Sequence, residues 1–455
     1  MPPCLAQAVH RALTVNLPIR GLLWFALYVM LALAPGVVAL VADPFDTPRP
    51  MLVEVSVALG LVAFAVIAAQ FALVSRFQAS SRPFGTDALM QFHQYIGGIA
   101  FALVVAHPLL LGAAGTPWSA WSPFGTGVAA RSGAVALWAL VGLVATTVFR
   151  RRLRLGYEEW QILHLTLATL AGVAMVAHVL AVNGYTRATP VRLTLLIYAA
   201  ACGIVTLQYR LVRPLSLRRT PWEVTANTDA GGSTRLLRVR PIGHAGFLFD
   251  PGQFAWLVTG RTPLWAQQHP LSICSSAEPG ADRALEFSIK ALGDWSSQIV
   301  PTLAPGARVW VDGPFGAFTT ERKAGQGFVM IAGGIGIAPM RSMLLSMRDR
   351  GDRRHVVLLY AVHDESRLIH HDELVGLQAS LNLDVVPVFE APPPNWSGET
   401  GQITADTLRR HQPVQWRRYH YFVCGPPPMM DAVEPMLAAL GVPTGSIESE
   451  RFNVV

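Results

Sequence analysis

The sequence predicts a multidomain membrane protein: a six-helix, all-α transmembrane domain, then an antiparallel β-barrel, then a doubly wound α/β domain. Three observations support this fold class. Six apolar runs approach the roughly 20 residues that a bilayer requires. Only 14% of the 455 residues are charged, whereas soluble domains carry about 25%. Beyond residue 212, short apolar runs alternate with Pro, Gly and charged residues, as in a soluble module.

The expected helices follow a short N-terminal tail, residues 1–20. The first apolar run exceeds the 7 to 15 residues of a signal-peptide core, so we expect it to be a retained helix. The fourth run is the shortest. The six expected spans are 21–42, 51–74, 88–113, 132–149, 157–182 and 191–212.

The arginines between these runs predict the orientation. Twelve lie in segments at one end of the helices and four at the other. The four are Arg49, Arg131, Arg187 and Arg192. By the positive-inside rule, the N-terminus and everything after residue 212 are cytoplasmic, in a multi-pass protein of the cell (inner) membrane. Membrane topology explains this basic charge, so we expect a lipid bilayer and no nucleic acid as partner.

The soluble half divides into two predicted domains, residues 213–322 and 323–455. Strands of a small antiparallel barrel are expected at 234–239, 254–259, 285–290 and 308–311. Strands that alternate with helical stretches are expected at 328–332, 356–361, 383–389 and 421–424, which is a doubly wound α/β pattern. The four cysteines form no CxxC pair, so neither a zinc finger nor a disulfide framework is indicated.

Four of the thirteen histidines lie inside apolar runs, His93 and His107 in the third and His164 and His178 in the fifth. Fourteen residues separate each pair, which puts both rings within about 40° on one helix face and about 21 Å apart along the axis. The two helices run in the same direction. His93 should therefore face His164, and His107 should face His178.

Imidazoles at membrane depth need a partner, and haem iron offers two opposite axial positions inside an apolar macrocycle. Two bis-histidine haems would satisfy all four residues. A proton relay and simple hydrogen-bonded histidines remain as alternatives.

Two motifs in the expected barrel suit a flavin. The edge strand His269, Pro270, Leu271 and Ser272 carries a hydroxyl that can bond a ring nitrogen. Downstream, Gly293, Asp294, Trp295 and Ser296 could open a helix whose free N–H groups favour a phosphate. A plain strand and a plain helix cap are the alternative interpretations.

Two glycine loops follow strands of the α/β domain. Gly333, Gly334 and Gly336 allow close approach to a pyrophosphate, and Pro339 suits a first helical turn. The second loop, Cys424, Gly425 and Pro426, also follows a strand and should lie beside the first.

With these motifs and Asp312 to Gly316 (DGPFG), nearly the whole chain resembles the NADPH oxidase and ferric reductase superfamily of transmembrane flavocytochromes. The resemblance implies that electrons pass from NAD(P)H to FAD, to the inner haem, to the outer haem and to an external acceptor. It implies that residues 269–272 hold the flavin ring and 293–296 its phosphates. It also implies that residues 333–339 hold the dinucleotide and that Cys424 and Gly425 border the nicotinamide.

Two positions depart from the family pattern. Relatives that prefer NADPH often carry Arg where this chain has His363; Arg367 and Ser366 either compensate or form a solvated turn. NADPH is thus only weakly preferred over NADH. Phe452 stands three residues from the end, either as an aromatic stacked on the flavin or as a core residue of a last strand.

The expected function is transmembrane electron transfer from NAD(P)H to an external acceptor, with no catalytic residues beyond the cofactors. Segment 112–130 carries Trp118, Trp121 and Phe124 but no charge, which slightly favours O2, reduced to superoxide, over a ferric chelate. A ferric-chelate reductase with the same chain of cofactors is the alternative. A rival from another class is a histidine-relay transporter with a nucleotide-sensing cytoplasmic module.

Overall fold

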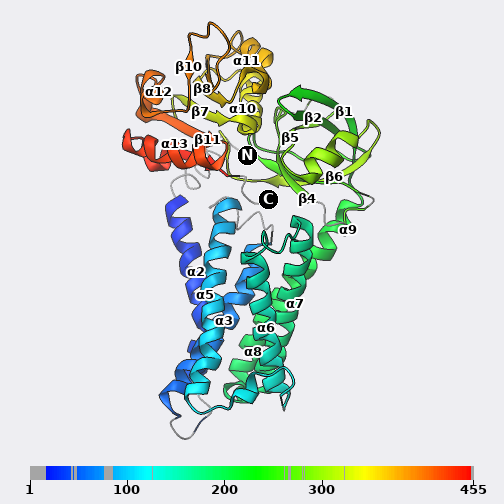
Figure 1. Ribbon diagram of the computed structural model, residues 1–455, viewed down its shortest axis with the longest axis vertical. Helices are drawn as coiled ribbons and strands as arrows, with labels where there is room; N and C mark the ends of the chain where they lie inside the picture. The colour runs from blue at the N-terminus through cyan, green and yellow to red at the C-terminus, as the bar shows by residue number, and fades with distance from the viewer. Residues whose placement is uncertain are drawn as a thin grey trace, which may run out of the picture. The chain divides into compact units, whose positions relative to one another are not determined.

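The computed structural model describes residues 17–42, 45, 49–75, 86–125, 127–260, 262–264, 268–278, 280, 282–321 and 323–451 (Figure 1). The chain forms two compact units, Met1–Phe84 with Ala88–Arg213 and Gly85–Asp87 with Pro214–Val455. The predicted barrel and the α/β domain therefore fall in one unit. Each unit is described by itself.

The membrane unit is a bundle of six helices that run side by side (Figure 1). Their bounds are α2 (Leu17–Val41), α3 (Met51–Leu73), α5 (Thr86–Ala113), α6 (Val128–Val148), α7 (Tyr157–Ala181) and α8 (Thr189–Leu207). All six are long and apolar enough to cross a membrane, which confirms the predicted all-α membrane domain. A π-helical turn (Gln208–Val212) and α9 (Arg213–Leu217) follow.

Helix α6 begins four residues before its predicted start because two polar side chains fold back onto its own backbone. Arg131 Nε donates to the carbonyl of Gly127 and Ser132 Oγ to that of Val128. Polar groups bonded in this way do not interrupt the helix. The apolar run alone therefore underestimates its length.

The first sheet of the soluble unit is antiparallel, with strand order β4-β3-β6-β1-β2-β5. Its strands are β1 (Pro221–Gly231), β2 (Thr234–Pro241), β3 (Phe254–Val258), β4 (Gln268–Ser272), β5 (Leu285–Lys290) and β6 (Arg308–Phe315). The edge strands meet through a single bridge between Ile273 and Phe287, so no regular ladder closes a barrel. The antiparallel prediction is confirmed, and the sheet remains open apart from this bridge.

Strand β1 was not expected from the sequence. Its segment contains two Thr, Asn, Asp and Gly, which are typical of turns as much as of strands. Pairing with β2 along its length and with β6 at its start overrides that weak local preference.

The second sheet is parallel, with strand order β10-β9-β8-β7-β11-β12. Its strands are β7 (Gly327–Gly333), β8 (His355–Val362), β9 (Leu383–Phe389), β10 (Glu399–Thr400), β11 (Tyr419–Cys424) and β12 (Ile447–Glu450). The helices are α10 (Ile337–Arg350), α11 (His371–Leu377), α12 (Ala405–Arg410) and α13 (Pro427–Ala439).

Helices cover both faces of this sheet. Phe328 and Met330 of β7 point into a core shared with α10 and α11. Val329 and Ile331 point into a second core shared with α12 and α13. Alternate residues of a strand face opposite sides of a sheet, so the doubly wound prediction is confirmed.

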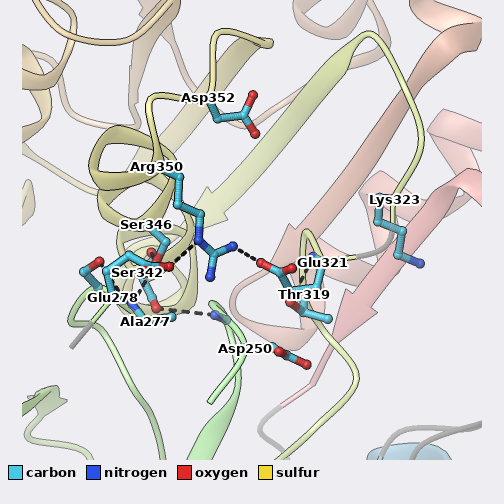
Figure 2. Close-up of polar contacts among 12 residues, drawn as sticks. Asp250, Ala277, Glu278, Thr319, Glu321, Lys323, Ser342, Ser346, Arg350 and Asp352 are labelled. Carbon is cyan, nitrogen blue, oxygen red and sulfur yellow. Dashed lines mark hydrogen bonds and ion pairs between the residues drawn. The ribbon is translucent and has the colours of Figure 1, made fainter. Parts of the chain in front are cut away.

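Helix α10 joins the two sheets of the soluble unit. Ser342 Oγ accepts from the backbone N–H of Gly252 (3.4 Å), and Ser346 Oγ accepts from that of Ala277 (2.8 Å). Figure 2 shows Arg350, at the end of α10, between Glu278 and Glu321. One helix thereby contacts the loops of the first sheet and packs on the second.

Candidate functional site

The four membrane histidines form two facing pairs on α5 and α7. The ring centroids of His93 and His164 lie 6.4 Å apart, and those of His107 and His178 lie 6.3 Å apart. The structure thus brings together the partners that the spacing of fourteen residues predicts.

Backbone carbonyls fix the rings of the second pair. His107 Nδ1 lies 2.8 Å from the carbonyl oxygen of Ser56, and His178 Nδ1 lies 2.8 Å from that of Ala129. Because a carbonyl oxygen only accepts, each Nδ1 carries the proton and each Nε2 keeps its lone pair. Metal-bound histidines commonly show this arrangement.

The first pair has weaker support. His164 Nδ1 lies 3.4 Å from Thr147 Oγ1, which also accepts from Trp160 Nε1 at 3.3 Å. Among the residues that the structure describes, His93 Nδ1 is buried without a hydrogen-bond partner. The two pairs therefore match in spacing but differ in how their rings are held.

The ring separations fit one metal ion between two imidazoles. A metal–nitrogen bond is about 2.0 to 2.1 Å and the ring centroid lies about 1.1 Å behind the nitrogen, so a clamped ion sets the centroids about 6.2 Å apart. Within the described ranges, no group of three or more His, Cys, Asp or Glu side chains could hold an ion. Two imidazoles alone suit an ion whose other positions a macrocycle fills, as in haem.

The two predicted flavin motifs meet in the first sheet. His269 on β4 stacks on Trp295, with centroids 3.8 Å apart and planes inclined by 18°. Trp295 Nε1 donates to Thr259 Oγ1 at 2.9 Å. Burial lowers the pKa of His269 to about 4, so its ring is neutral at pH 7. Ser272, at the end of the same strand, is buried.

The expected helix after Gly293 is much shorter than a full α-helix. Only a π-helical turn (Trp295–Ile299) and a 3-10 turn (Val300–Thr302) follow. The backbone N–H groups of Leu292 and Gly293 donate to Ser296 Oγ, each at 2.9 Å. The Ser296 hydroxyl thus accepts from two N–H groups just before the turn, and a phosphate site at Gly293 to Ser296 stays a prediction.

The two glycine loops touch, as their strands predict. Strands β7 and β11 are parallel neighbours. A Cβ at Gly333 would lie 2.6 Å from Met429 Sδ, and one at Gly336 would lie 2.1 Å from the carbonyl oxygen of Cys424. Gly425 is equally crowded, with Met429 Cε 2.6 Å from its added Cβ. Side chains would separate the loops, so glycine is required.

A cavity of about 340 Å³ opens beside these loops, where the strand order reverses next to β7. Open α/β sheets bind ligands at this place. It is lined by five predicted nucleotide residues, Gly333, Gly334, His363, Arg367 and Pro426. Pro339 lies in the first turn of α10, directly after the loop.

Other residues that line this nucleotide crevice were not predicted, and they include four from outside the two glycine loops. Gly232, Thr234 and Lys290 come from the first sheet, and Glu390 follows β9. Glu390 ends an apolar strand, which is a recognisable signal. The other three come from the neighbouring domain, so the motifs of the nucleotide domain give no signal for them.

His363 and Arg367 both have carboxylate partners in the crevice. His363 Nδ1 lies 2.9 Å from Glu390 Oε2, and Arg367 Nε lies 3.4 Å from Asp364 Oδ2. All four side chains are at least about one third exposed. The crevice therefore offers mixed charge at the ends of β8 and β9.

A larger cavity, about 750 Å³, lies at the opposite ends of the parallel strands, between His355, Asp384 and Tyr419. It contains none of the predicted site residues. Since ligands of such sheets bind at the carboxyl ends, we assign nucleotide binding to the smaller crevice. Phe452 lies outside the described residues.

Comparison with known proteins supports three domains. The ferric reductase like transmembrane component matches residues 59–175. An FAD-binding domain matches residues 233–319, and an oxidoreductase NAD-binding domain matches residues 330–435.

Curated relatives match about half of the chain or less. The reductase component of propane 2-monooxygenase from Rhodococcus jostii is 31% identical over 226 residues, 48% of this chain and 59% of that protein. NADH-cytochrome b5 reductase 1 from Cryptococcus neoformans is 32% identical over 157 residues, 32% of this chain and 53% of that protein. This chain thus spans between one half and two thirds of these relatives.

Among solved structures, the flavohemoglobin of Malassezia yamatoensis has a TM-score of 0.50 at 16% identity, covering 88% of this chain and 99% of that one. The FAD/NAD-binding domain of nitric oxide dioxygenase from Vibrio cholerae has a TM-score of 0.46 at 19% identity, covering 51% and 98%. At these identities the likeness concerns the fold alone. By its ferric-reductase-like membrane domain and its FAD-binding and NAD-binding domains, the chain has the domain architecture of the NADPH oxidase and ferric reductase superfamily.

Proposed function

We propose that this oxidoreductase passes electrons from cytoplasmic NAD(P)H through FAD and two b-type haems to an acceptor on the outer side of the membrane. One observation carries the proposal: two facing histidine pairs, on the same two helices, have ring separations that fit an ion between them. When bound, FAD would accept a hydride and release single electrons, which the haems would carry across the bilayer.

The chain's own residues provide the positions for this sequence. The crevice between Gly333, His363 and Pro426 would hold the nucleotide, and His269 to Ser272 on β4 would lie against the flavin ring. Gly293 to Ser296, Cys424 and Gly425 complete the proposed contacts. The four membrane histidines would each supply one nitrogen ligand to a haem. No acid–base residue is needed.

Molecular oxygen, reduced to superoxide, is the acceptor that we favour. A ferric chelate is usually anionic and would need free cations near the His107–His178 pair. Arg49, near that end of the bundle, is paired with Glu54 at 3.4 Å and lies 4.6 Å from the Phe45 ring centroid. Arg187, whose Nε donates to the carbonyl of Asn183, keeps its charge, but the connection from α5 to α6, residues 112–130, carries no charged side chain. The match to a ferric reductase like component keeps ferric-chelate reduction as the second candidate.

NADPH is proposed as the weakly preferred donor, because His363, Arg367 and Lys290 line the crevice. Glu390 pairs with His363 and Asp364 pairs with Arg367, so the preference over NADH should be small. The cytoplasmic side of the soluble unit and the cell membrane as location are parts of the same proposal.

The central test is an anaerobic visible spectrum of the purified protein with FAD, before and after NADPH and then NADH. We expect b-type haem bands that become reduced, and about half of the haem in His107→Ala. His371→Ala, which changes an exposed histidine on α11, is the control and should keep both haems. Full haem content in His107→Ala would refute the assignment.

The acceptor needs a separate measurement. Cells that produce the protein should give a superoxide signal that disappears when oxygen is removed. Vigorous anaerobic ferric-chelate reduction without any superoxide signal would establish the second candidate instead.

A further inference from the structure

The rings of His107 and His178 each lie against a backbone carbonyl of a different neighbouring helix. His107 of α5 lies against α3, where the carbonyl of Ser56 accepts from Nδ1 and the Ser56 hydroxyl lies 2.9 Å from the same nitrogen. His178 of α7 lies against α6, where the carbonyl of Ala129 accepts from Nδ1. In both cases a glycine stands four residues after the carbonyl, Gly60 in α3 and Gly133 in α6.

This spacing has a steric reason. Side chains of a helix point towards its N-terminus, so the residue at i+4 covers the turn that contains the carbonyl of residue i. A glycine at i+4 leaves that carbonyl open to a ring from the next helix. Each imidazole can then approach the backbone edge-on, although the carbonyl already belongs to a helix.

The distances show how tightly the rings fit. A Cβ at Gly133 would lie 2.8 Å from His178 Nδ1 and 3.0 Å from Cε1. A Cβ at Gly60 would lie 3.1 Å from His107 Nδ1 and 3.3 Å from Cε1. Both separations are shorter than ordinary van der Waals contact, so a methyl group would displace the ring.

Other glycines of the bundle lack this relation. An added Cβ at Gly98 of α5 meets nothing within 4 Å, and at Gly142 of α6 it meets only Leu167, at 3.7 Å. Among the described glycines, Gly60 and Gly133 are the two whose Cβ would meet a membrane histidine. No described glycine lies in this way beside His93 or His164.

We propose that Gly60 and Gly133 are positioning residues for the His107–His178 pair. Each admits an imidazole to a helix carbonyl, which fixes the Nδ1–H tautomer, aims the Nε2 lone pair at the facing ring and raises its basicity. The inference rests on the proposed function, since it concerns the same haem site. According to this proposal, backbone carbonyls orient the rings of the His107–His178 pair only. The two haems should therefore differ in how firmly their histidine ligands are held.

The test uses the full-length protein in detergent. Gly133→Ala and Gly60→Ala are compared with Gly98→Ala and Gly142→Ala, and alanine is the better helix former at all four positions. The readouts are haem per chain and the low-temperature electron paramagnetic resonance signals of the oxidised protein. Flavin content and gel filtration report folding.

We expect one haem signal to change and the other to remain. Gly133→Ala should be more severe than Gly60→Ala, with haem affinity at that pair reduced about 10- to 100-fold and haem content approaching half. Gly60→Ala should shift the signal with smaller loss. Ser56→Ala removes the hydroxyl that lies 2.9 Å from His107 Nδ1 but keeps the carbonyl and leaves room for the ring, so it should resemble the wild type more than Gly60→Ala does.

Failure of the inference can be told from failure of the proposed function. If the wild type binds two haems and both Gly60→Ala and Gly133→Ala give the spectra of Gly98→Ala, the positioning role is refuted. If the folded wild type binds no haem, the proposed function itself fails. Should Gly133→Ala not accumulate as folded protein, the milder Gly60→Ala decides the question.

Discussion

At the scale of single residues, Glu390 decides what the nucleotide crevice offers to a 2′-phosphate. Its carboxylate lies 2.9 Å from His363 Nδ1, at the end of β9. It holds the histidine and adds a negative charge near the expected ribose position. A 2′-hydroxyl tolerates such a carboxylate, whereas a 2′-phosphate is repelled by it.

Glu390→Gln should therefore shift the donor preference towards NADPH. Loss of one charge repulsion of about 1 kcal/mol predicts a roughly fivefold rise in the ratio of kcat/KM for NADPH to that for NADH. Stopped-flow flavin reduction with each donor measures the ratio. An unchanged ratio would show that the ribose lies elsewhere.

His370 gives the soluble unit a dependence on acid pH. Its Nε2 lies 2.9 Å from Ser288 Oγ, and its side chain is 7% exposed. Burial, together with the nearby Arg341 guanidinium, lowers the pKa of His370 to about 4. The unfolded chain therefore binds more protons between about pH 4 and 6.5, and stability is lost as the pH falls through this window.

Between pH 7 and pH 5, this residue should cost about 2 kcal/mol of stability. The temperature at which FAD is released, followed by flavin fluorescence, should fall accordingly. His370→Gln should reduce the loss, while His355→Gln, a change at a partly exposed histidine next to Asp384, should not. Part of the loss should persist in His370→Gln because His269 titrates in the same direction. An identical pH profile for the wild type and His370→Gln would contradict this account.

The histidine pairs could be predicted from the sequence because helix periodicity and arginine counts suffice to place four rings. The hydrogen-bond partners of these rings could not be predicted. The acceptors at Ser56 and Ala129 are backbone carbonyls, which every residue has, so no residue type announces them. Glu390 could have been found from its place after an apolar strand.

At the scale of elements, α10 is the joint between the two sheets. Arg341, which is 6% exposed, reaches the carbonyl of Cys274 at 2.9 Å, Glu286 at 2.8 Å and Glu373 at 2.6 Å. Cys274 follows β4 and Glu286 lies in β5 of the first sheet, whereas Glu373 lies on α11, which packs on the second sheet. Removal of a buried cation leaves its partners without compensation, which is costly.

Arg341→Met should lower the stability of the soluble unit by about 2 kcal/mol and the temperature of FAD release by about 4 °C or more. Arg350→Met is the matched control on the same helix. Its ion pairs with Glu278 and Glu321 are 29 to 43% exposed and should contribute at most about 1 kcal/mol. Equal shifts in the two variants would refute the distinction.

The elements that the sequence misplaces are those in which local preference is weak. Strand β1 depends on its neighbours, and the segment after Gly293 forms short turns closed by the Ser296 hydroxyl. Long apolar helices and strands with buried faces were predicted well, because burial on both sides of a sheet leaves continuous apolar runs.

At the scale of the whole molecule, the bilayer makes the bundle predictable, since every spanning segment must satisfy its own backbone. The arginine distribution predicts which side of the membrane each connection faces. In intact cells, Gly115→Cys, in the connection after α5, should react with a membrane-impermeant maleimide. Ser233→Cys, in the β1–β2 turn, should react only after permeabilisation. The unsubstituted chain is the control, and reversed labelling would invert the proposed orientation.

The nucleotide crevice takes part of its lining from each sheet, with Thr234 and Lys290 on one side and Gly333 and His363 on the other. A ligand bound there adds contacts that exist only while the two domains stay associated. By mass action, nucleotide at a hundredfold excess over its Kd stabilises that arrangement by about 2.7 kcal/mol. Bound nucleotide thus also stabilises the folded soluble unit. At low nucleotide concentration, the protein should release flavin faster, and proteases should cut more readily at the boundary between the two domains.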